Sequence, residues 1–192
     1  MTEEKDAPRR SDARRNRERI LAVALEELTR SADAPLSAIA KKAGVGQGTF
    51  YRHFPNREAL VLELYRHEMQ QVADSAAALL AVHAPDRALR EWMDRLARFA
   101  LTKVGLADAI RQAAGAPGSP GRPGPAPVLA AAEALLRAAE EAGTIRPGVS
   151  ADDFFLAIAG LWQIGPSEDW QARAGRLMDL VMDALRAGAP KQ

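Results

Sequence analysis

Hydrophobic residues recur along this chain at intervals of three and four, the spacing that places them on one face of a helix. Runs at residues 21–28 and 36–43 predict a first helix of about four turns from Ser11 onward and a second of about two turns that ends at Gly44. Further helical patterns cover residues 47–54, 57–82, 86–103, 106–114, 128–142, 151–164 and 167–187. No segment alternates apolar and polar residues over the length of a strand, so we expect an all-α fold of about nine helices.

Composition divides the chain into three parts. Residues 1–10 are polar, charged and without periodicity, which predicts a disordered tail. Residues 11–56 hold three short helices, and residues 57–192 form a larger helical domain that starts with a long helix capped by Asn56. Within the larger domain, residues 115–127 (GAPGSPGRPGPAP) predict an exposed loop with polyproline character.

The composition narrows the class of protein. The 192 residues are 47% hydrophobic and include no cysteine, which fits a soluble globular protein of a reducing compartment, without disulfides or thiolate metal sites. The longest apolar stretch, residues 154–162, is far below the roughly 20 residues that cross a bilayer. The acidic amino terminus lacks the apolar region of a signal peptide. We therefore expect a cytoplasmic protein.

Charge is distributed unevenly, although the formal net charge is only +1. Residues 1–57 carry 12 Lys and Arg against 8 Asp and Glu, a balance of +4, whereas residues 58–192 carry 14 against 17, a balance of −3. A basic end is typical of contact with nucleic acid. An ordinary solvated helix surface accounts for this imbalance equally well, so charge alone does not indicate binding to nucleic acid.

The predicted helices at 36–43 and 47–54, joined by a turn with Gly44 and Gly46, have the dimensions of a helix-turn-helix. In that motif the second helix lies in the major groove of DNA while the first braces it. Short helix pairs also occur in many other α-proteins. Here Phe50 and Phe54 can pack inward, while hydrogen-bonding side chains lie between them, so that one face packs and the other can contact DNA.

The polar positions of the second helix suit different parts of a duplex. Gln47 can pair with an adenine edge, and Gly48 lets the backbone approach closely. Thr49 offers a hydroxyl to a phosphate and a methyl group to thymine. Tyr51 and His53 carry polar tips suited to phosphate oxygens, with partial burial against the first helix as the alternative.

Arg57 stands in the first turn of the long helix, where exposed N–H groups favour an anion. A phosphate contact is therefore one interpretation of this side chain. Simple solvation is the other.

The segment with these two helices and the start of the long helix resembles the TetR family of bacterial transcriptional regulators. The family pattern is Ala-Gly-Val, a capping residue, two variable positions, Thr, an aromatic residue, Tyr, any residue, His-Phe, and then Lys or Arg and Leu; here it runs from residue 43 to 60. The resemblance implies that Tyr51, His53 and Arg57 grip phosphates, while Gln47, Gly48 and Arg52 vary with the operator. Two positions depart from the pattern, since Gly46 replaces the usual Ser or Thr cap and Phe50 replaces a more usual Leu.

The rest of the chain resembles the ligand and dimer domain of the same family in helix order, and GTIRPGVSADDF resembles the hinge of one subgroup. The resemblance implies a homodimeric, ligand-responsive regulator, a repressor released from a near-palindromic DNA operator by a small-molecule effector. Two alternatives stay open. One is a helical small-molecule carrier with a vestigial DNA-binding head, and the other is an architectural DNA binder without an effector.

Two apolar faces are candidates for ligand and dimer contacts. In residues 86–103, a shared face can line an apolar pocket, with core packing as the alternative; it consists of Trp92, Met93, Leu96 and Phe99. The last two helices carry apolar stripes wider than one core contact requires, which predicts a homodimer interface, with the internal core of one protomer as the alternative. The candidate interface residues are Phe155, Ile158, Trp162, Trp170, Leu177, Met178, Val181 and Leu185.

Two motifs that could indicate an enzyme do not match the pattern that a catalytic or cofactor site requires. His67-Glu68 begins a zinc-protease-like motif, but Gln71 occupies the position of the second ligand. The glycines of GVGQGT fail the register of a dinucleotide-binding loop, and no strand precedes them. We therefore expect a protein that is not an enzyme, with no catalytic residues, no metal and no cofactor.

Overall fold

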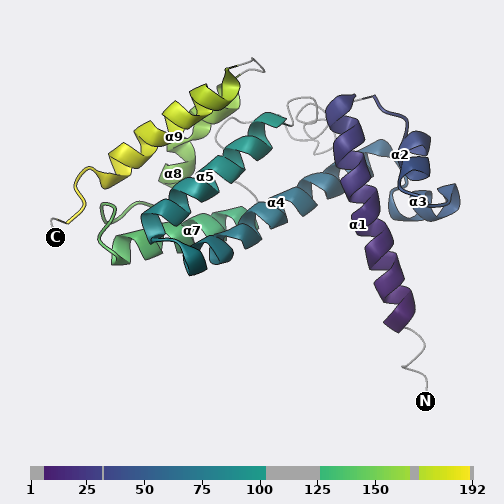
Figure 1. Cartoon of the computed structure of the whole chain (residues 1–192), viewed down its shortest axis with the longest axis horizontal. Coiled ribbons are helices and arrows are strands. Elements are labelled where there is room, and N and C mark those ends of the chain that lie inside the picture. The colour runs from purple at the N-terminus through teal and green to yellow at the C-terminus, as the bar shows by residue number, and fades with distance from the viewer. Residues whose placement is uncertain (1–6, 32, 103–125, 165–168, 191–192) are drawn as a thin grey trace. The chain divides into compact units, whose positions relative to one another are not determined.

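The computed structural model describes residues 7–31, 33–102, 126–164 and 169–190 (Figure 1). Their secondary structure is helical throughout, which confirms the all-α class. The helices are α1 (Ala7–Arg30), α2 (Leu36–Lys42), α3 (Gln47–His53), α4 (Arg57–Val82), α5 (Pro85–Thr102), α7 (Ala126–Glu141), α8 (Ala151–Ala157), the 3₁₀ helix η1 (Ala159–Gln163) and α9 (Trp170–Arg186). The predicted helix at 106–114 and most of the predicted loop at 115–127 lie outside the described residues.

The chain forms two compact units. The first contains the described residues up to His67, and the second contains those from Glu68 onward. The domain boundary expected after Asn56 coincides with the start of α4, whereas the units divide within α4. None of the described helices is long and apolar enough to span a bilayer.

The amino terminus differs from expectation. The first helix begins at Ala7 rather than at Ser11, so residues 7–10 of the predicted tail are helical. A proline at the second position of α1 is compatible with this start, because the N–H that it lacks would find no partner in the first turn of a helix.

In the first unit, α1, α2, α3 and the start of α4 surround one apolar core. Every member of this core is at most 7% exposed. Burial of each larger side chain of this core, a Leu, Ile, Val or Phe, stabilises the unit by about 1.5 to 3 kcal/mol. The core consists of Ile20, Leu21, Ala24, Leu28, Ala34, Ile39, Ala40, Ala43, Phe50, Phe54, Leu60, Val61 and Leu64.

In the second unit, α5 packs on α7 and α9, and α8 packs on α7 (Figure 1). Trp92 of α5 is fully buried and donates a hydrogen bond of 2.9 Å from Nε1 to the main-chain carbonyl oxygen of Val72. Arg90 pairs with Asp179 at 2.8 Å, so a polar contact supplements the apolar packing of α5 on α9. The core of this unit is therefore organised around α5.

The segment predicted as one helix over residues 151–164 is split. Ser150 caps α8 by accepting a hydrogen bond of 3.1 Å from the backbone N–H of Asp153, which confirms the predicted cap. The α-helix ends at Ala157, and the 3₁₀ helix η1 follows. Gly160, a poor helix former, lies in η1 where a Cβ would meet Leu177 at 3.6 Å, so this stretch contacts α9 closely.

Candidate nucleic-acid interface

The turn between α2 and α3 is held by glycine and by two backbone hydrogen bonds. Gly44 has a φ of +64°, in the left-handed region that glycine adopts without strain. Its N–H bonds to the carbonyl oxygen of Lys41 at 3.1 Å, and the N–H of Val45 bonds to that of Ala40 at 3.1 Å. These bonds terminate α2 and set the point from which α3 begins.

The two faces of α3 differ sharply in burial. Phe50 and Phe54 are 0% and 1% exposed, and their ring centroids lie 5.8 Å apart. The other positions of α3 are polar or glycine. Its exposed members are Gln47, Gly48, Tyr51 and Arg52, and its half-buried members are Thr49 and His53. The structure therefore places six of the predicted DNA contacts on one short helix that Phe50 and Phe54 anchor in the core.

Two of the polar rings rest against this apolar face. Tyr51 meets Phe50 edge to face, with ring centroids 5.6 Å apart, yet remains 43% exposed. His53 lies 6.1 Å from Phe54 and is half-buried. The packing limits the rotamers of both rings while leaving Tyr51 accessible, which reduces the entropy cost of a contact made by that side chain.

Arg57 is not simply solvated. It starts α4, is half-buried, and donates a hydrogen bond from Nη2 to the main-chain carbonyl oxygen of Ala34, just before α2. Asn56 caps the same helix, since its Oδ1 accepts from the N–H of Ala59 at 2.8 Å, as the sequence predicted. Gly46, at the start of α3, supplies no side-chain cap.

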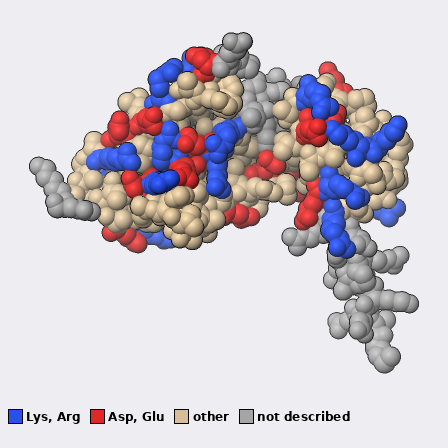
Figure 2. All heavy atoms as spheres, in the orientation of Figure 1, with Lys and Arg blue, Asp and Glu red and all other residues tan. Residues whose placement is uncertain are grey.

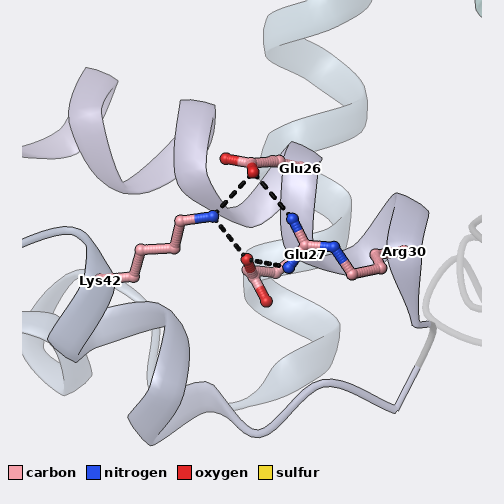
Figure 3. A network of polar contacts seen from close by, with 4 residues as sticks. All are labelled: Glu26, Glu27, Arg30 and Lys42. Carbon is pink, nitrogen blue, oxygen red and sulfur yellow. Dashed lines mark hydrogen bonds and ion pairs between the residues drawn. The ribbon is translucent and has the colours of Figure 1, made fainter.

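A network of four charged side chains joins α1 to α2 (Figure 3). Lys42 Nζ lies 2.7 Å from Glu26 Oε1 and 2.7 Å from Glu27 Oε1. Arg30 contacts the same two carboxylates, each at 2.8 Å. The hydrogen bond from Lys42 is the main cause that lowers the pKa of both glutamates, and the two carboxylates in turn raise the pKa of Lys42. Sequence reasoning missed this network, although opposite charges at 26, 27 and 30 were a visible signal.

The visible surface of each unit carries Lys and Arg interspersed with Asp and Glu (Figure 2). On this face of the first unit, the Lys and Arg residues that the structure describes do not form a continuous basic patch. The specific side chains of α3, rather than the net charge, therefore favour contact with nucleic acid.

The four predicted ligand residues lie together in the core of the second unit. Trp92 and Met93 are 0% exposed, Leu96 is 2% and Phe99 is 8%. The Trp92 ring lies 6.5 Å from that of Phe154. These side chains pack in the protomer core, and any ligand near Trp92 would have to fit among them.

The predicted dimer residues separate into two groups. Four are buried within the protomer, namely Ile158, Met178, Val181 and Leu185. Three are half-buried, namely Phe155, Trp170 and Leu177, and the side chain of Trp162 lies outside what the structure describes. Sequence reasoning missed the exposed Leu156 on α8 and Leu180 on α9, at 60% and 67%, because periodicity selects the inward stripe and passes over apolar residues outside it.

Comparisons with known proteins agree with this arrangement. Residues 20–64 match the family model of bacterial regulatory proteins of the tetR family, and residues 84–187 match that of the C-terminal domain of SbtR-like transcriptional regulators. No enzyme family is indicated. The comparison with curated proteins finds no significant match.

Solved structures extend the likeness over most of the chain. The TetR transcriptional regulator SCO0520 from Streptomyces coelicolor is 42% identical over 88% of this chain and 98% of its own, with a TM-score of 0.74. A TetR transcription regulatory protein from Mycobacterium vanbaalenii is 34% identical over 92% and 98%, with a TM-score of 0.69. The regulator FadR from Bacillus subtilis, solved with stearoyl-CoA, is 17% identical over 87% and 98% and shares the fold, with a TM-score of 0.56. With its helix-turn-helix followed by a helical carboxy-terminal region, the chain belongs to the TetR family of bacterial transcriptional regulators.

Proposed function

We propose that this protein is a cytoplasmic, homodimeric repressor that binds a near-palindromic operator through α3 and leaves it when a small-molecule effector binds. The observation that carries the proposal is the two-sided character of α3. Its polar side exposes Gln47 and Arg52, while Phe50 and Phe54 anchor it in the core. A helix that is fixed on one face and polar on the other can be inserted into a major groove without losing its packing.

The side chains of α3 divide into two roles. Gln47, Gly48 and Arg52 are exposed and would face base edges, with Gln47 suited to adenine. Thr49, Tyr51 and His53 would bind phosphate oxygens and hold the helix in register. Arg57 would add its charge at the start of α4 while keeping its bond to Ala34.

Dimerisation would involve α8 and α9. Leu156 and Leu180 are large apolar side chains that remain exposed in the protomer, and Phe155, Trp170 and Leu177 add half-buried apolar surface on the same two helices. The proposed contact requires that these side chains form one continuous apolar patch, because single exposed apolar residues are ordinary on a protein surface. A symmetric dimer would present two α3 helices to successive major grooves, about 34 to 36 Å apart or somewhat more.

The effector would be largely apolar and would be held by residues 57–192, near Trp92. The apolar side chains around Trp92 favour such a ligand. FadR, which shares the fold, was solved in complex with stearoyl-CoA, and this supports a small-molecule ligand for the present chain. Binding there would act through α4, which continues from the second unit to Arg57 beside the helix-turn-helix.

The proposal is tested by selecting genomic fragments with the intact chain and measuring their affinity by band shift over a range of salt concentrations. We expect a preferred near-palindromic site that is bound by a dimer. Sequence-indifferent binding would favour an architectural DNA binder instead, and no DNA binding together with ligand binding would favour a carrier.

Effector coupling is tested separately by titrating small apolar compounds against tryptophan emission, with and without the selected duplex. Because coupling between sites is reciprocal, an effector that weakens operator binding by 5- to 150-fold must itself bind the DNA complex more weakly by the same factor. Equal effector affinity in both titrations would remove the release mechanism and leave the DNA binding intact.

A further inference from the structure

We infer that the network of Glu26, Glu27, Arg30 and Lys42 is a clamp that positions α2, and through it α3, for DNA binding, and that Lys42 is a positioning residue rather than a phosphate contact. The inference rests on the proposed DNA-binding function for its effect on affinity. Its effect on the helix-turn-helix itself can be measured without DNA.

The network is centred on a half-buried carboxylate. The side chain of Glu27 is only 17% exposed, compared with 55% for Glu26, 41% for Lys42 and 60% for Arg30. Two cations, Lys42 and Arg30, both contact Glu27, each within 2.8 Å. Isolated pairs on a protein surface contribute little because water and salt screen them, whereas a half-buried carboxylate that is shared by two cations is screened less.

Lys42 lies next to the turn that leads into α3, so the clamp can affect the position of α3. Lys42 is the last residue of α2, and only the glycine turn of residues 43–46 separates it from the first residue of α3. Within its own span α2 buries Ile39 and Ala40 and packs Leu36 partly against the core, so a helix of about two turns has few apolar anchors. A contact at its carboxyl end therefore restrains the point from which α3 starts, and the helix dipole favours a cation there.

The same geometry argues against a phosphate contact by Lys42. Its ammonium already lies 2.7 Å from each of two carboxylates. An incoming phosphate would have to displace Glu26 or Glu27 and would meet their negative charges at close range. Lys41, the neighbouring exposed lysine of α2, lies outside the network and is the matched control for loss of positive charge from this helix.

The test measures the affinity of the full chain for a duplex that the wild type selects from random sequence, over a range of salt concentrations. We expect Lys42→Gln and Glu27→Gln each to weaken binding by about threefold to tenfold without changing the salt slope, because loosening α2 lowers the fraction of molecules ready to bind. Lys42→Arg, which can bond both carboxylates, should restore the affinity. Glu26→Gln should have a smaller effect, since Glu26 is more exposed.

The direction in which Glu27→Gln changes DNA affinity distinguishes a positioning role of the network from a purely electrostatic effect of its charges. Removing a negative charge near DNA strengthens binding if charge alone matters, so weaker binding supports the clamp. Tighter or unchanged binding by Glu27→Gln, or a salt slope that falls by about one in Lys42→Gln, would overturn the inference. Lys41→Gln should leave amide exchange in α2 and α3 unchanged, whatever its effect on the salt slope.

Amide hydrogen exchange without DNA provides the independent measurement. In Glu27→Gln and Lys42→Gln, the amides of α2 and α3 should exchange faster, while those of α9 in the other unit should not change. Equal acceleration across both units would indicate general destabilisation and contradict the clamp. If the wild type selects no duplex, the proposed DNA binding fails, and the exchange experiment still decides whether the network restrains α2 and α3.

Discussion

The guanidinium of Arg57, the first residue of α4, donates a hydrogen bond to the main-chain carbonyl oxygen of Ala34, in the segment that leads into α2. A residue expected to bind phosphate thus also connects two elements of the helix-turn-helix unit. The hydrogen bond and the charge of this side chain can be tested separately.

We expect Arg57→Ala to lower the free energy of unfolding by about 1 kcal/mol, the usual contribution of one hydrogen bond. Arg57→Lys should lose much of the same stability, because the ammonium lacks the guanidinium fork, but should keep the charge. If Arg57 also grips phosphate, the salt slope of DNA binding falls by about one in Arg57→Ala and stays in Arg57→Lys. Urea unfolding and salt-titrated band shifts measure the two effects, and equal salt slopes in all three proteins would confine Arg57 to its structural role.

Base reading and phosphate binding on α3 should separate by substitution. Gln47→Ala should cost about 1 to 3 kcal/mol of binding only on duplexes that carry its base, because a bidentate pair discriminates by that amount. Tyr51→Phe removes one hydroxyl and should weaken all duplexes about equally. Affinities for cognate and scrambled duplexes decide the matter. Equal weakening of both by Gln47→Ala would show that Gln47 does not read a base.

The core of the second unit depends on the indole of Trp92, which is buried and bonded to Val72. Trp92→Phe removes that hydrogen bond and leaves a cavity, so we expect the free energy of unfolding to fall by about 2 kcal/mol. Val82→Ala, at a side chain that is 71% exposed, should change it by less than about 0.5 kcal/mol. Chemical denaturation measures both variants, and similar small losses would mean that the core around Trp92 repacks.

The proposed dimer contact depends on Leu180 of α9 and Leu156 of α8. Leu180→Glu should weaken the dimer at least about tenfold, because it places a charge in an apolar contact, while the secondary structure of the protomer stays the same. Gln171→Glu adds the same charge to another exposed position of α9 and should leave the dimer intact. Sedimentation equilibrium measures both. A dimer unchanged by Leu180→Glu would place the interface elsewhere.

The clamp should respond to acid. The pKa of Glu27 lies below its ordinary value of 4.5, mainly because of the hydrogen bond from Lys42, so its ionised form stabilises the folded state. That contribution is present above the ordinary pKa and disappears as the pH falls through the lowered one. We therefore expect the difference in stability between the wild type and Glu27→Gln to close as the pH drops below about 4.5. If the wild type is still more stable than Glu27→Gln at pH 2, the stability difference arises from packing rather than from the ion pairs.

The sequence by itself determined the helical class, most helix positions and the face of α3 that is polar. These features are local, because they depend on apolar spacing, on caps such as Asn56 and Ser150, and on the left-handed glycine at position 44. The pattern around residues 43–60 also pointed to the family, since a helix-turn-helix is built from one short continuous segment.

Only the tertiary structure decided which apolar residues complete the protomer and which stay exposed. Periodicity marks a face but does not say what covers it, so the sequence could not tell whether the stripe that contains Met178 packs inside the protomer or against a second copy. Contacts between residues far apart in the sequence were also beyond local pattern, as for Arg57 with Ala34 and for Lys42 with Glu27. The partner of a charged side chain depends on the distance between the two groups and on their exposure to water. Both are determined only when the helices pack together.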